Sequence, residues 1–434
     1  MRGALVTILL RVLSLAAMMI SSIVIARLLG PAQFGSYSFV LSIVAMASLP
    51  VQMGIPTLVM RETAAGAALE NWARVRGVWY WSGRAAIVTS TLTLAVLTGA
   101  LVIIGIAKGG LESGAIFYSA LPLVPLLGLA EIRGSALNGL KRIVAGTLPD
   151  KILRPLGLAV ALIGISMLMP IPVTATTAMM THSVIALLTF LLGGWLLLRA
   201  RPAAMVSATG LETDGPAWIR TILPIALIGG LQTISHNVDL LMLGLFRSDE
   251  EVGVYKVALS ASNLTIFGLT ALSFYVQPYI VHFHATGDWR KLQRATSMGA
   301  TGALMLALPL VLVFCLFPAG ILSFLFGDAF AAGASPLVIL VLAQLGNAAF
   351  GFTGMLLPVL GLEKYALYAF VISTSLNIAG NLILIPAYGT VGAAIATGFS
   401  VLVWNFACWI VIYRKLNIDA TVFGFLNHRP GWLK

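Results

Sequence analysis

Residues 365–413 read YALYAFVISTSLNIAGNLILIPAYGTVGAAIATGFSVLVWNFACWIVIY and contain no Asp, Glu, Lys or Arg. This run is long enough for two helical membrane spans, which need about 20 residues each. Pro386-Ala-Tyr-Gly389 lies inside the run and carries the turn-forming residues that would separate two helices. The stretch therefore predicts a pair of membrane-spanning helices.

Composition extends this prediction to the whole chain of 434 residues. Apolar residues make up 59% and charged residues only 9%, whereas a soluble domain carries about 25% charged residues. Outer-membrane barrels are excluded because their strands alternate apolar and polar residues over about 10 positions. Uncharged runs also cover 85–107, 155–198, 257–287, 295–327 and 329–362. We therefore predict an all-α integral membrane protein.

The apolar runs predict twelve spans in two six-helix bundles. The spans are separated by turn residues, which include Gly30-Pro31, Pro170-Ile-Pro172 and Pro386–Gly389. The longest hydrophilic segment, 199–217, separates the halves, giving an N-terminal bundle at 1–198, a cytoplasmic linker, a C-terminal bundle at 218–413 and a cytoplasmic tail at 414–434. The expected spans are 6–28, 36–59, 82–106, 115–139, 149–169, 172–198, 218–246, 252–281, 296–325, 332–360, 364–386 and 390–413.

A short repeat relates the two halves. Gly35-Ser-Tyr37 and Gly253-Val-Tyr255 each stand at the entry of the second helix of their half. An even number of spans gives both halves the same orientation. The repeat therefore predicts pseudo-two-fold symmetry about an axis along the membrane normal, an arrangement found in some transporters.

The basic residues predict the orientation. If the N-terminus is cytoplasmic, only Arg27, Lys108, Arg247 and Lys256 of the 26 Lys and Arg lie near outer ends, and the other 22 lie near inner ends. Short cytoplasmic loops carry such an excess of basic residues. Both termini are therefore expected inside. The net charge of +11 then has a topological origin, and no nucleic-acid partner is predicted.

Polar side chains recur at helical spacing within the apolar runs. Span 252–281 carries Lys256, Ser260, Asn263, Thr270 and Gln277 along one face, and span 364–386 carries Thr374, Asn377 and Asn381. Polar groups in membrane helices face protein or water because lipid cannot solvate them. We interpret these stripes as the wall of a hydrated central cavity, with hydrogen bonding between helices as the alternative.

Four arginines lie within spans of the first half, near the expected cytoplasmic face: Arg11, Arg84, Arg133 and Arg154. They are interpreted as a cationic vestibule, or alternatively as side chains that reach the headgroups. Asp150 stands four residues before Arg154 and is expected to satisfy part of its charge. Glu131 is expected to pair with Arg133 or a neighbour.

Asp239 is the only acidic residue well inside a span of the second half, and His236 precedes it by one helical turn. Together they predict a cation or proton site. The alternative is a buried ion pair between Asp239 and Lys256.

Common catalytic motifs are missing from the sequence, which has no P-loop, His-Glu-x-x-His or Gly-x-Ser-x-Gly pattern. His282 and His284 are two residues apart at a helix end and diverge, so no metal or cofactor is predicted. A membrane glycan polymerase or ligase would need a large outer loop, whereas 107–114 and 246–252 are short. The chain is not expected to be an enzyme.

Three stretches resemble a known family: IARLLGPAQFGSY at 25–37, GIPTLVMRE at 54–62 and IPAYGTVGAAIAT at 385–397. They are similar to the polysaccharide biosynthesis, or O-antigen flippase, family of the multidrug/oligosaccharidyl-lipid/polysaccharide exporter superfamily. The resemblance implies twelve spans in two bundles that rock in alternating access.

The resemblance implies transfer of an undecaprenyl-pyrophosphate-linked oligosaccharide from the cytoplasmic to the periplasmic leaflet of a bacterial inner membrane. The glycan would be a repeat unit of O-antigen lipopolysaccharide, capsule or exopolysaccharide. Expected partners are membrane lipids, a coupling proton or sodium ion, and polysaccharide polymerase and assembly proteins. The candidate substrate-binding residues are Arg11, Arg84, Arg133, Arg154, Lys256, Asn263 and Asn377, and the candidate coupling residues are Asp239 and His236.

The alternative function is cation- or proton-coupled export of small solutes. Drug antiporters of the superfamily often carry an acid in span 1, where this chain has Arg11 and no acid. This difference favours the lipid-linked oligosaccharide, whose pyrophosphate suits arginine.

Overall fold

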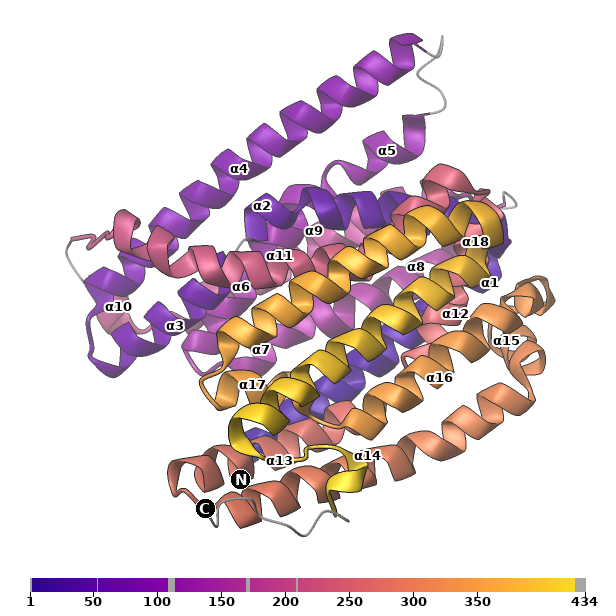
Figure 1. Ribbon diagram of the computed structural model, residues 1–434. Coiled ribbons are helices and arrows are strands. Elements are labelled where there is room, and N and C mark those ends of the chain that lie inside the picture. The colour runs from indigo at the N-terminus through magenta and orange to yellow at the C-terminus, as the bar shows by residue number, and fades with distance from the viewer. Residues whose placement is uncertain (1, 53, 108–113, 169–171, 208–209, 426–434) are drawn as a thin grey trace. The chain divides into compact units, whose positions relative to one another are not determined.

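The computed structural model describes residues 2–52, 54–107, 114–168, 172–207 and 210–425, and all secondary structure in them is helical (Figure 1). Eight helices of these residues are long and apolar enough to cross a membrane, or nine if a bent pair counts as one span. The prediction of an all-α membrane protein is confirmed. The predicted break at Pro170 and most of the outer loop 107–114 lie outside the described residues.

The chain forms two compact units. The first comprises Met1–Leu29 and Ser36–Asn237, and the second comprises Gly30–Gly35 and Val238–Lys434. The boundary therefore falls inside a helix, at Asn237, and not at the hydrophilic segment 199–217. The division into two six-helix bundles stays a prediction.

The helices that contribute to the first unit are α1 (Arg2–Ala47), α2 (Leu49–Gln52), α3 (Ile55–Ala68), α4 (Trp72–Ala107), α5 (Ala115–Ala120), α6 (Leu123–Gly139), α7 (Ile143–Leu148), the π-helix η2 (Pro149–Leu153), α8 (Arg154–Leu168), α9 (Ala175–Ala200), α10 (Ala203–Ser207) and α11 (Gly215–Phe246). The second unit contains α12 (Asp249–Ser262), α13 (Phe267–Ala285), α14 (Trp289–Leu316), α15 (Pro318–Phe326), η3 (Asp328–Gly333), α16 (Ala334–Phe350), α17 (Thr353–Val359), α18 (Glu363–Leu416) and η4 (Val422–Phe425).

The two longest helices are each broken at a glycine. α1 has 46 residues and α18 has 54, so at 1.5 Å per residue they would measure about 69 and 81 Å, far more than a bilayer core of about 30 Å. Gly30 has φ 71° and ψ 173°, and Gly389 has φ 56° and ψ −129°. These non-helical positions coincide with the turns predicted at Gly30-Pro31 and Pro386–Gly389.

The span predicted at 252–281 is interrupted in the structure. α12 ends at Ser262, α13 begins at Phe267, and the two are bent by 46°. Thr265 Oγ1 donates to the Ser262 carbonyl at 2.6 Å, and Ser262 Oγ donates to the Leu259 carbonyl at 2.9 Å. Such local side-chain bonds compete with the helical backbone pattern, and they interrupt the polar stripe of this span.

The described part of the segment 199–217 belongs to unit 1 and packs near the start of α4. Asn71 Nδ2 donates to Glu212 Oε2 at 3.0 Å, and the Glu212 amide donates to the Ala73 carbonyl at 3.3 Å. Trp81 meets Trp218 edge to face with ring centroids 5.6 Å apart. The segment is thus attached to the corner between α3 and α4.

Two equivalent glycines of the sequence repeat touch within unit 2. A Cβ on Gly253 would stand 3.1 Å from the Gly35 amide nitrogen, and a Cβ on Gly35 would stand 2.9 Å from the Gly253 amide nitrogen. Both are closer than side chains normally approach, so glycine is needed at each position. The start of the second part of α1 therefore crosses α12 backbone to backbone.

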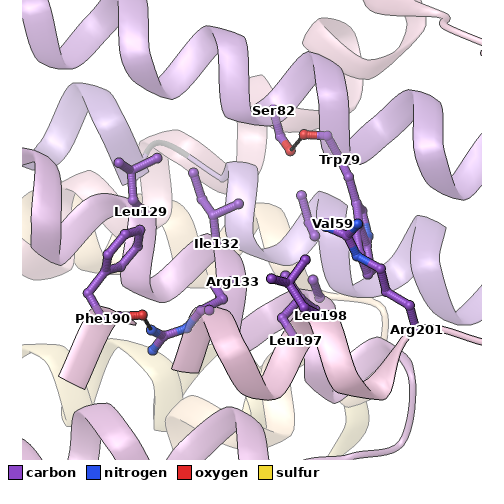
Figure 2. A pocket seen from close by; sticks show the side chains of 12 residues that line it. Val59, Trp79, Ser82, Leu129, Ile132, Arg133, Phe190, Leu197, Leu198 and Arg201 are labelled. Atoms are coloured by element: carbon purple, nitrogen blue, oxygen red, sulfur yellow. Dashed lines mark hydrogen bonds between the residues drawn. The ribbon is translucent and has the colours of Figure 1, made fainter. Parts of the chain in front are cut away.

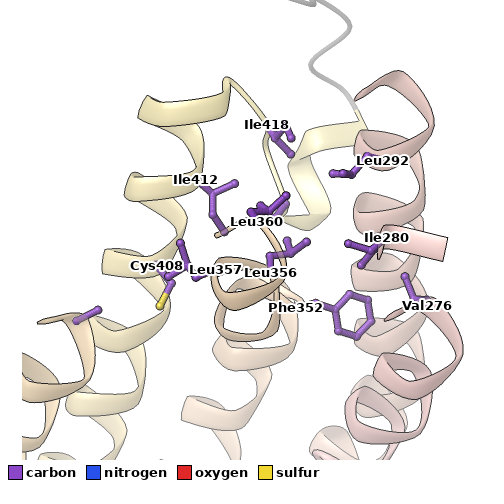
Figure 3. Packing of buried hydrophobic residues seen from close by; sticks show 12 residues of the cluster. Val276, Ile280, Leu292, Phe352, Leu356, Leu357, Leu360, Cys408, Ile412 and Ile418 are labelled. Carbon is purple, nitrogen blue, oxygen red and sulfur yellow. The ribbon is translucent and has the colours of Figure 1, made fainter. Parts of the chain in front are cut away.

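The segment after α18 closes one apolar core of unit 2. Ile418 and Ala420 are buried with residues of α13, α14, α17 and α18, and Figure 3 shows Ile418 beside Leu292 and Leu360. The side chain of Gln293 holds the segment by both ends of its amide. Its Oε1 accepts from the Asp419 amide at 2.8 Å, and its Nε2 donates to the Asp419 carbonyl.

Candidate functional sites

Asp239 is the centre of a buried polar cluster in unit 2. It lies on α11 and is only 3% exposed. Its carboxylate accepts hydrogen bonds from Tyr255 OH at 2.9 Å, Asn381 Nδ2 at 2.6 Å and Thr397 Oγ1. The donors come from α12 and from both parts of α18, on either side of Gly389. Helices that are distant in the sequence are thus joined through one acid.

Asn377 extends the cluster along α18. Its Oδ1 accepts from Asn381 Nδ2 at 3.3 Å, and its Nδ2 donates to Thr397 Oγ1 at 3.4 Å. The oxygen of the Asn381 side chain is buried and has no hydrogen-bond partner among the residues that the structure describes. An unpartnered oxygen beside a carboxylate is costly unless a cation or donor binds it.

The other candidates of the second half are less buried than this carboxylate. His236 is exposed, Lys256 is half-buried, and Asn263 is exposed at the end of α12. Asp239 takes part in no ion pair of the described residues. The alternative ion pair between Asp239 and Lys256 is therefore not formed, and the acid is held by neutral groups.

Arg133 is part of the structural core of unit 1. It is 6% exposed and forms an ion pair with the buried Asp150 of η2. Its Nη1 donates to the Phe190 carbonyl at 2.7 Å and to the Thr189 carbonyl at 3.2 Å. The neighbouring Glu131 pairs with Lys151. Both pairs cross between α6 and η2. The expected pair of Asp150 with Arg154 is therefore wrong, and Glu131 pairs with a neighbour, Lys151, and not with Arg133.

Arg154 lies near a buried tyrosine–histidine pair. Tyr37 OH and His182 Nδ1 share a hydrogen bond of 2.8 Å that joins α1 to α9. Arg154, half-buried at the start of α8, interacts electrostatically with both residues. It forms no ion pair among the described residues. This arrangement leaves a cation available beside a polar pair.

Arg11 and Arg84 lie on exposed positions of α1 and α4. The four arginines thus occupy different surroundings: two are exposed, one is half-buried and one is fully committed to an ion pair. The structure does not show them as a single cluster.

A pocket of about 390 Å³ opens in unit 1 between α3, α4, α6 and α9 (Figure 2). Arg201 and Arg133 line it, and each guanidinium is near an aromatic ring: 5.9 Å from Trp79 and 5.4 Å from Phe190, respectively. Trp79 and Arg201 were not among the candidate residues predicted from the sequence. Their signal, an aromatic and a basic residue at two helix ends, is also that of an ordinary membrane-interface anchor.

Comparisons with known proteins agree with this architecture. The fold resembles the inward-facing conformation of a multidrug resistance MATE family transporter of the MOP superfamily, with a TM-score of 0.75, 15% identity, and coverage of 94% of this chain and 95% of that chain. The molecule is therefore a multi-pass membrane protein with a MATE-type fold. The profile named MatE matches residues 224–383, and the profile of the polysaccharide biosynthesis protein family matches residues 1–284. The chain belongs to the polysaccharide biosynthesis protein family.

Two curated relatives are from Haloferax volcanii. The probable low-salt glycan biosynthesis flippase Agl15 is 26% identical over 195 residues, 45% of this chain and 40% of that protein. The probable flippase AglR is 32% identical over 174 residues, 39% of this chain and 36% of that protein. The matches thus span well under half the length of these relatives.

Proposed function

We propose that the protein is a flippase that moves a lipid-linked oligosaccharide from the cytoplasmic to the outer leaflet. The observation that carries this proposal is the match to the polysaccharide biosynthesis family over residues 1–284. The names of the two archaeal relatives support it over part of their length. The proposed substrate is an undecaprenyl-pyrophosphate-linked repeat unit of O-antigen, capsule or exopolysaccharide, and the proposed location is a bacterial inner membrane.

The proposal includes twelve spans with both termini inside. The glycine breaks in α1 and α18 support it, because each of these helices has the length of two spans. The contact between Gly35 and Gly253 supports the pseudo-two-fold relation, since equivalent residues that lie near a two-fold axis contact each other. The 22 basic residues assigned to inner ends support the orientation.

Arg154 is the proposed main contact for the pyrophosphate, with Arg11 and Arg84 attracting it from exposed positions. Arg133 is not proposed for this role, because its donors already bind Asp150 and two backbone carbonyls. Lys256 and Asn263 are proposed to contact the glycan. Guanidinium groups suit this substrate because they bind phosphate oxygens with paired, charge-assisted hydrogen bonds.

Asp239 is the proposed coupling residue. The residues proposed to form the ion site with it are Asn377, Asn381, Thr397 and Tyr255, and His236 is no longer included. Carboxylate, amide and hydroxyl oxygens are hard ligands that suit a hard cation such as sodium, and the unpartnered oxygen of Asn381 supports a cation there. A proton on Asp239 is the other form of the same coupling. Either ion would release the hydrogen bonds between α11, α12 and α18 and so change how these helices pack.

Membrane potential provides a second source of drive. A pyrophosphate diester carries about two negative charges, and each charge moved through 100 mV changes the free energy by about 2.3 kcal/mol. Outward movement is favourable when the inside is negative. A coupled cation adds to this drive only if it enters as the substrate leaves.

Proteoliposomes with a labelled lipid-linked oligosaccharide test the proposal, with membrane potential and ion gradients imposed separately. The wild-type protein should make the inner-leaflet glycan accessible outside. Asp239→Asn should abolish the response to a sodium or proton gradient and keep the response to potential. No glycan translocation by the wild-type protein under any gradient would overturn the proposal.

Ion-coupled export of small solutes is the second candidate. The buried Asp239 cluster favours it as much as it favours a coupled flippase, because both need an ion site. Solute efflux that depends on Asp239, in liposomes that show no glycan translocation, would select this function.

A further inference from the structure

We propose that the pocket between α3, α4, α6 and α9 binds one anionic phospholipid of the surrounding bilayer, with its phosphate on Arg201 and a hydrocarbon chain along the apolar wall. The proposal goes beyond the flippase activity and does not depend on it. It concerns residues of unit 1 only, and none of them belongs to the Asp239 cluster or to the surroundings of Arg154.

The walls of the pocket are suited to a hydrocarbon chain. Val59, Leu129, Ile132, Leu197 and Leu198 line it, and its volume of about 390 Å³ lies within the range of about 300–1,000 Å³ of small-molecule sites. Figure 2 shows these side chains on helices that surround one space. In a membrane protein such a space next to lipid-facing helices fills with lipid, because no other apolar molecule is as abundant there.

The polar end of the pocket is suited to a phosphate. Arg201 stands at the end of α9, where the helix stops and the backbone turns extended. Its guanidinium lies over Trp79, whose Nε1 is fixed by a 2.8 Å hydrogen bond to Thr63 Oγ1. None of the described residues that line the pocket is acidic.

Arg201 also forms no ion pair in the part of the chain that the structure describes. A guanidinium held in place by an aromatic ring, without a carboxylate partner, is complementary to an anion. Basic pockets between membrane helices on the cytoplasmic side bind anionic lipid headgroups. The predicted topology puts the end of α9 on that side.

The chain offers a matched control for the charge. Arg199 lies two residues earlier on α9, and its guanidinium stacks over Trp195 at 5.2 Å, but neither residue lines the pocket. Arg201→Ala and Arg199→Ala therefore remove the same charge from the same helix end, one inside the pocket and one outside it.

A second pair of variants fills space and leaves the charges unchanged. Gly194 lines the pocket, and no described heavy atom outside its own stretch of helix lies within 4 Å of the place where its Cβ would stand. Gly194→Leu should therefore occupy the pocket without a clash. Gly164 on α8 is equally open but does not line the pocket, so Gly164→Leu is its control.

The experiment is a lipid titration of purified full-length protein in detergent, followed by native mass spectrometry, with phosphatidylglycerol and phosphatidylcholine as probes. Wild type, Arg199→Ala and Gly164→Leu should bind the first phosphatidylglycerol equally. Arg201→Ala should bind it about five-fold more weakly, the ratio expected for one arginine near an anionic headgroup. Gly194→Leu should lose the tight site, and phosphatidylcholine should bind weakly to every variant.

Several results would overturn the proposal. Equal binding of phosphatidylglycerol by Arg201→Ala and wild type would show that Arg201 does not contact the phosphate. An equal loss of binding in Arg199→Ala and Arg201→Ala would indicate general attraction by the charges at the helix end. Tight binding of phosphatidylcholine would mean that the pocket is an apolar groove that does not select an anionic headgroup. Displacement of phosphatidylglycerol by undecaprenyl phosphate at lower concentration would assign the pocket to the substrate carrier.

Discussion

Two arginines of unit 1 show how surroundings decide the role of a residue. Arg133 is enclosed by Asp150 and the carbonyls of Thr189 and Phe190, so its charge is neutralised inside the protein. Arg154 has no acidic partner among the described residues and faces the Tyr37–His182 pair. The first is expected to support folding and the second to contact an anion.

Arg133→Ala should unfold the protein more easily, because it leaves the carboxylate of Asp150 buried without a partner. Breaking a buried pair in this way costs about 3–5 kcal/mol. Thermal unfolding in detergent, followed by size-exclusion chromatography, measures the loss. Arg133→Met combined with Asp150→Leu should recover most of it, and a double variant as unstable as Arg133→Ala would contradict the explanation.

Arg154→Ala should keep the protein folded and abundant in the membrane and reduce glycan translocation at least about ten-fold, the effect of losing one charge-assisted phosphate contact. Arg154→Lys should recover part of the rate, because the charge returns without the paired geometry. Translocation in proteoliposomes measures both. An undiminished translocation rate in Arg154→Ala would show that Arg154 does not contact the substrate.

The candidate residues were predictable from the sequence where a single helix carries the signal. Asp239 was found because an acid within an apolar run is rare, and Asn377 because it shares a face with Asn381. The partners of Asp239 and the pairing of Arg133 with Asp150 were not predictable, since they depend on how separate helices approach each other. Arg201 was missed because a basic residue at a helix end is ordinary in a membrane protein.

Among the elements, the crossing of α1 and α12 at Gly35 and Gly253 has the least room for change. Gly35→Ala should lower stability by about 1–3 kcal/mol, the usual effect of forcing a methyl group into a packed contact. Gly83→Ala on α4 is the matched control, because no heavy atom lies within 4 Å of its Cβ position. A lower melting temperature for Gly35→Ala only is expected. Equal melting temperatures would mean that the crossing relaxes freely.

Removal of the Gln293 side-chain amide should loosen the segment after α18. Gln293→Ala deletes both hydrogen bonds to the backbone of Asp419, and amide hydrogen exchange at Asp419 and Thr421 should become about ten-fold faster. Arg294→Ala, at the exposed neighbouring position, should leave exchange unchanged. Faster exchange in both variants would indicate general loosening of α14.

Element boundaries followed from the sequence where glycine and proline set them. Gly30-Pro31 and Pro386–Gly389 predicted the breaks in α1 and α18, because such residues act through local backbone conformation. The break between α12 and α13 was missed because apolar periodicity alone predicts one continuous helix there. The hydroxyl groups of Ser262 and Thr265 form hydrogen bonds to nearby backbone carbonyls, and these compete with the helical backbone pattern. The π-helix at Pro149–Leu153 has no comparable sequence signal.

At the scale of the whole molecule, the predicted topology can be tested by labelling. Ala204 and Glu250 are exposed, and the predicted topology puts them on opposite sides of the membrane. Single cysteines there, in a background without Cys315 and Cys408, should differ at least about ten-fold in reaction with an impermeant maleimide added outside. Glu250→Cys should react and Ala204→Cys should not. Met205 is buried and would give a misleading negative result. Reaction at 204 alone would reverse the orientation.

The membership of Gly30–Gly35 in unit 2 has a consequence for the order of synthesis. These residues leave the ribosome early, but the partner of Gly35, Gly253, is made more than 200 residues later. At about 5–20 residues per second, the segment waits on the order of 10–40 s for its contact. During that interval the kinked region of α1, at the turn predicted between the spans 6–28 and 36–59, exposes a glycine-lined backbone surface that lacks its partner helix. Slower translation between these points would lengthen the vulnerable period, so codon choice over 36–252 can influence the yield of folded protein without changing any residue.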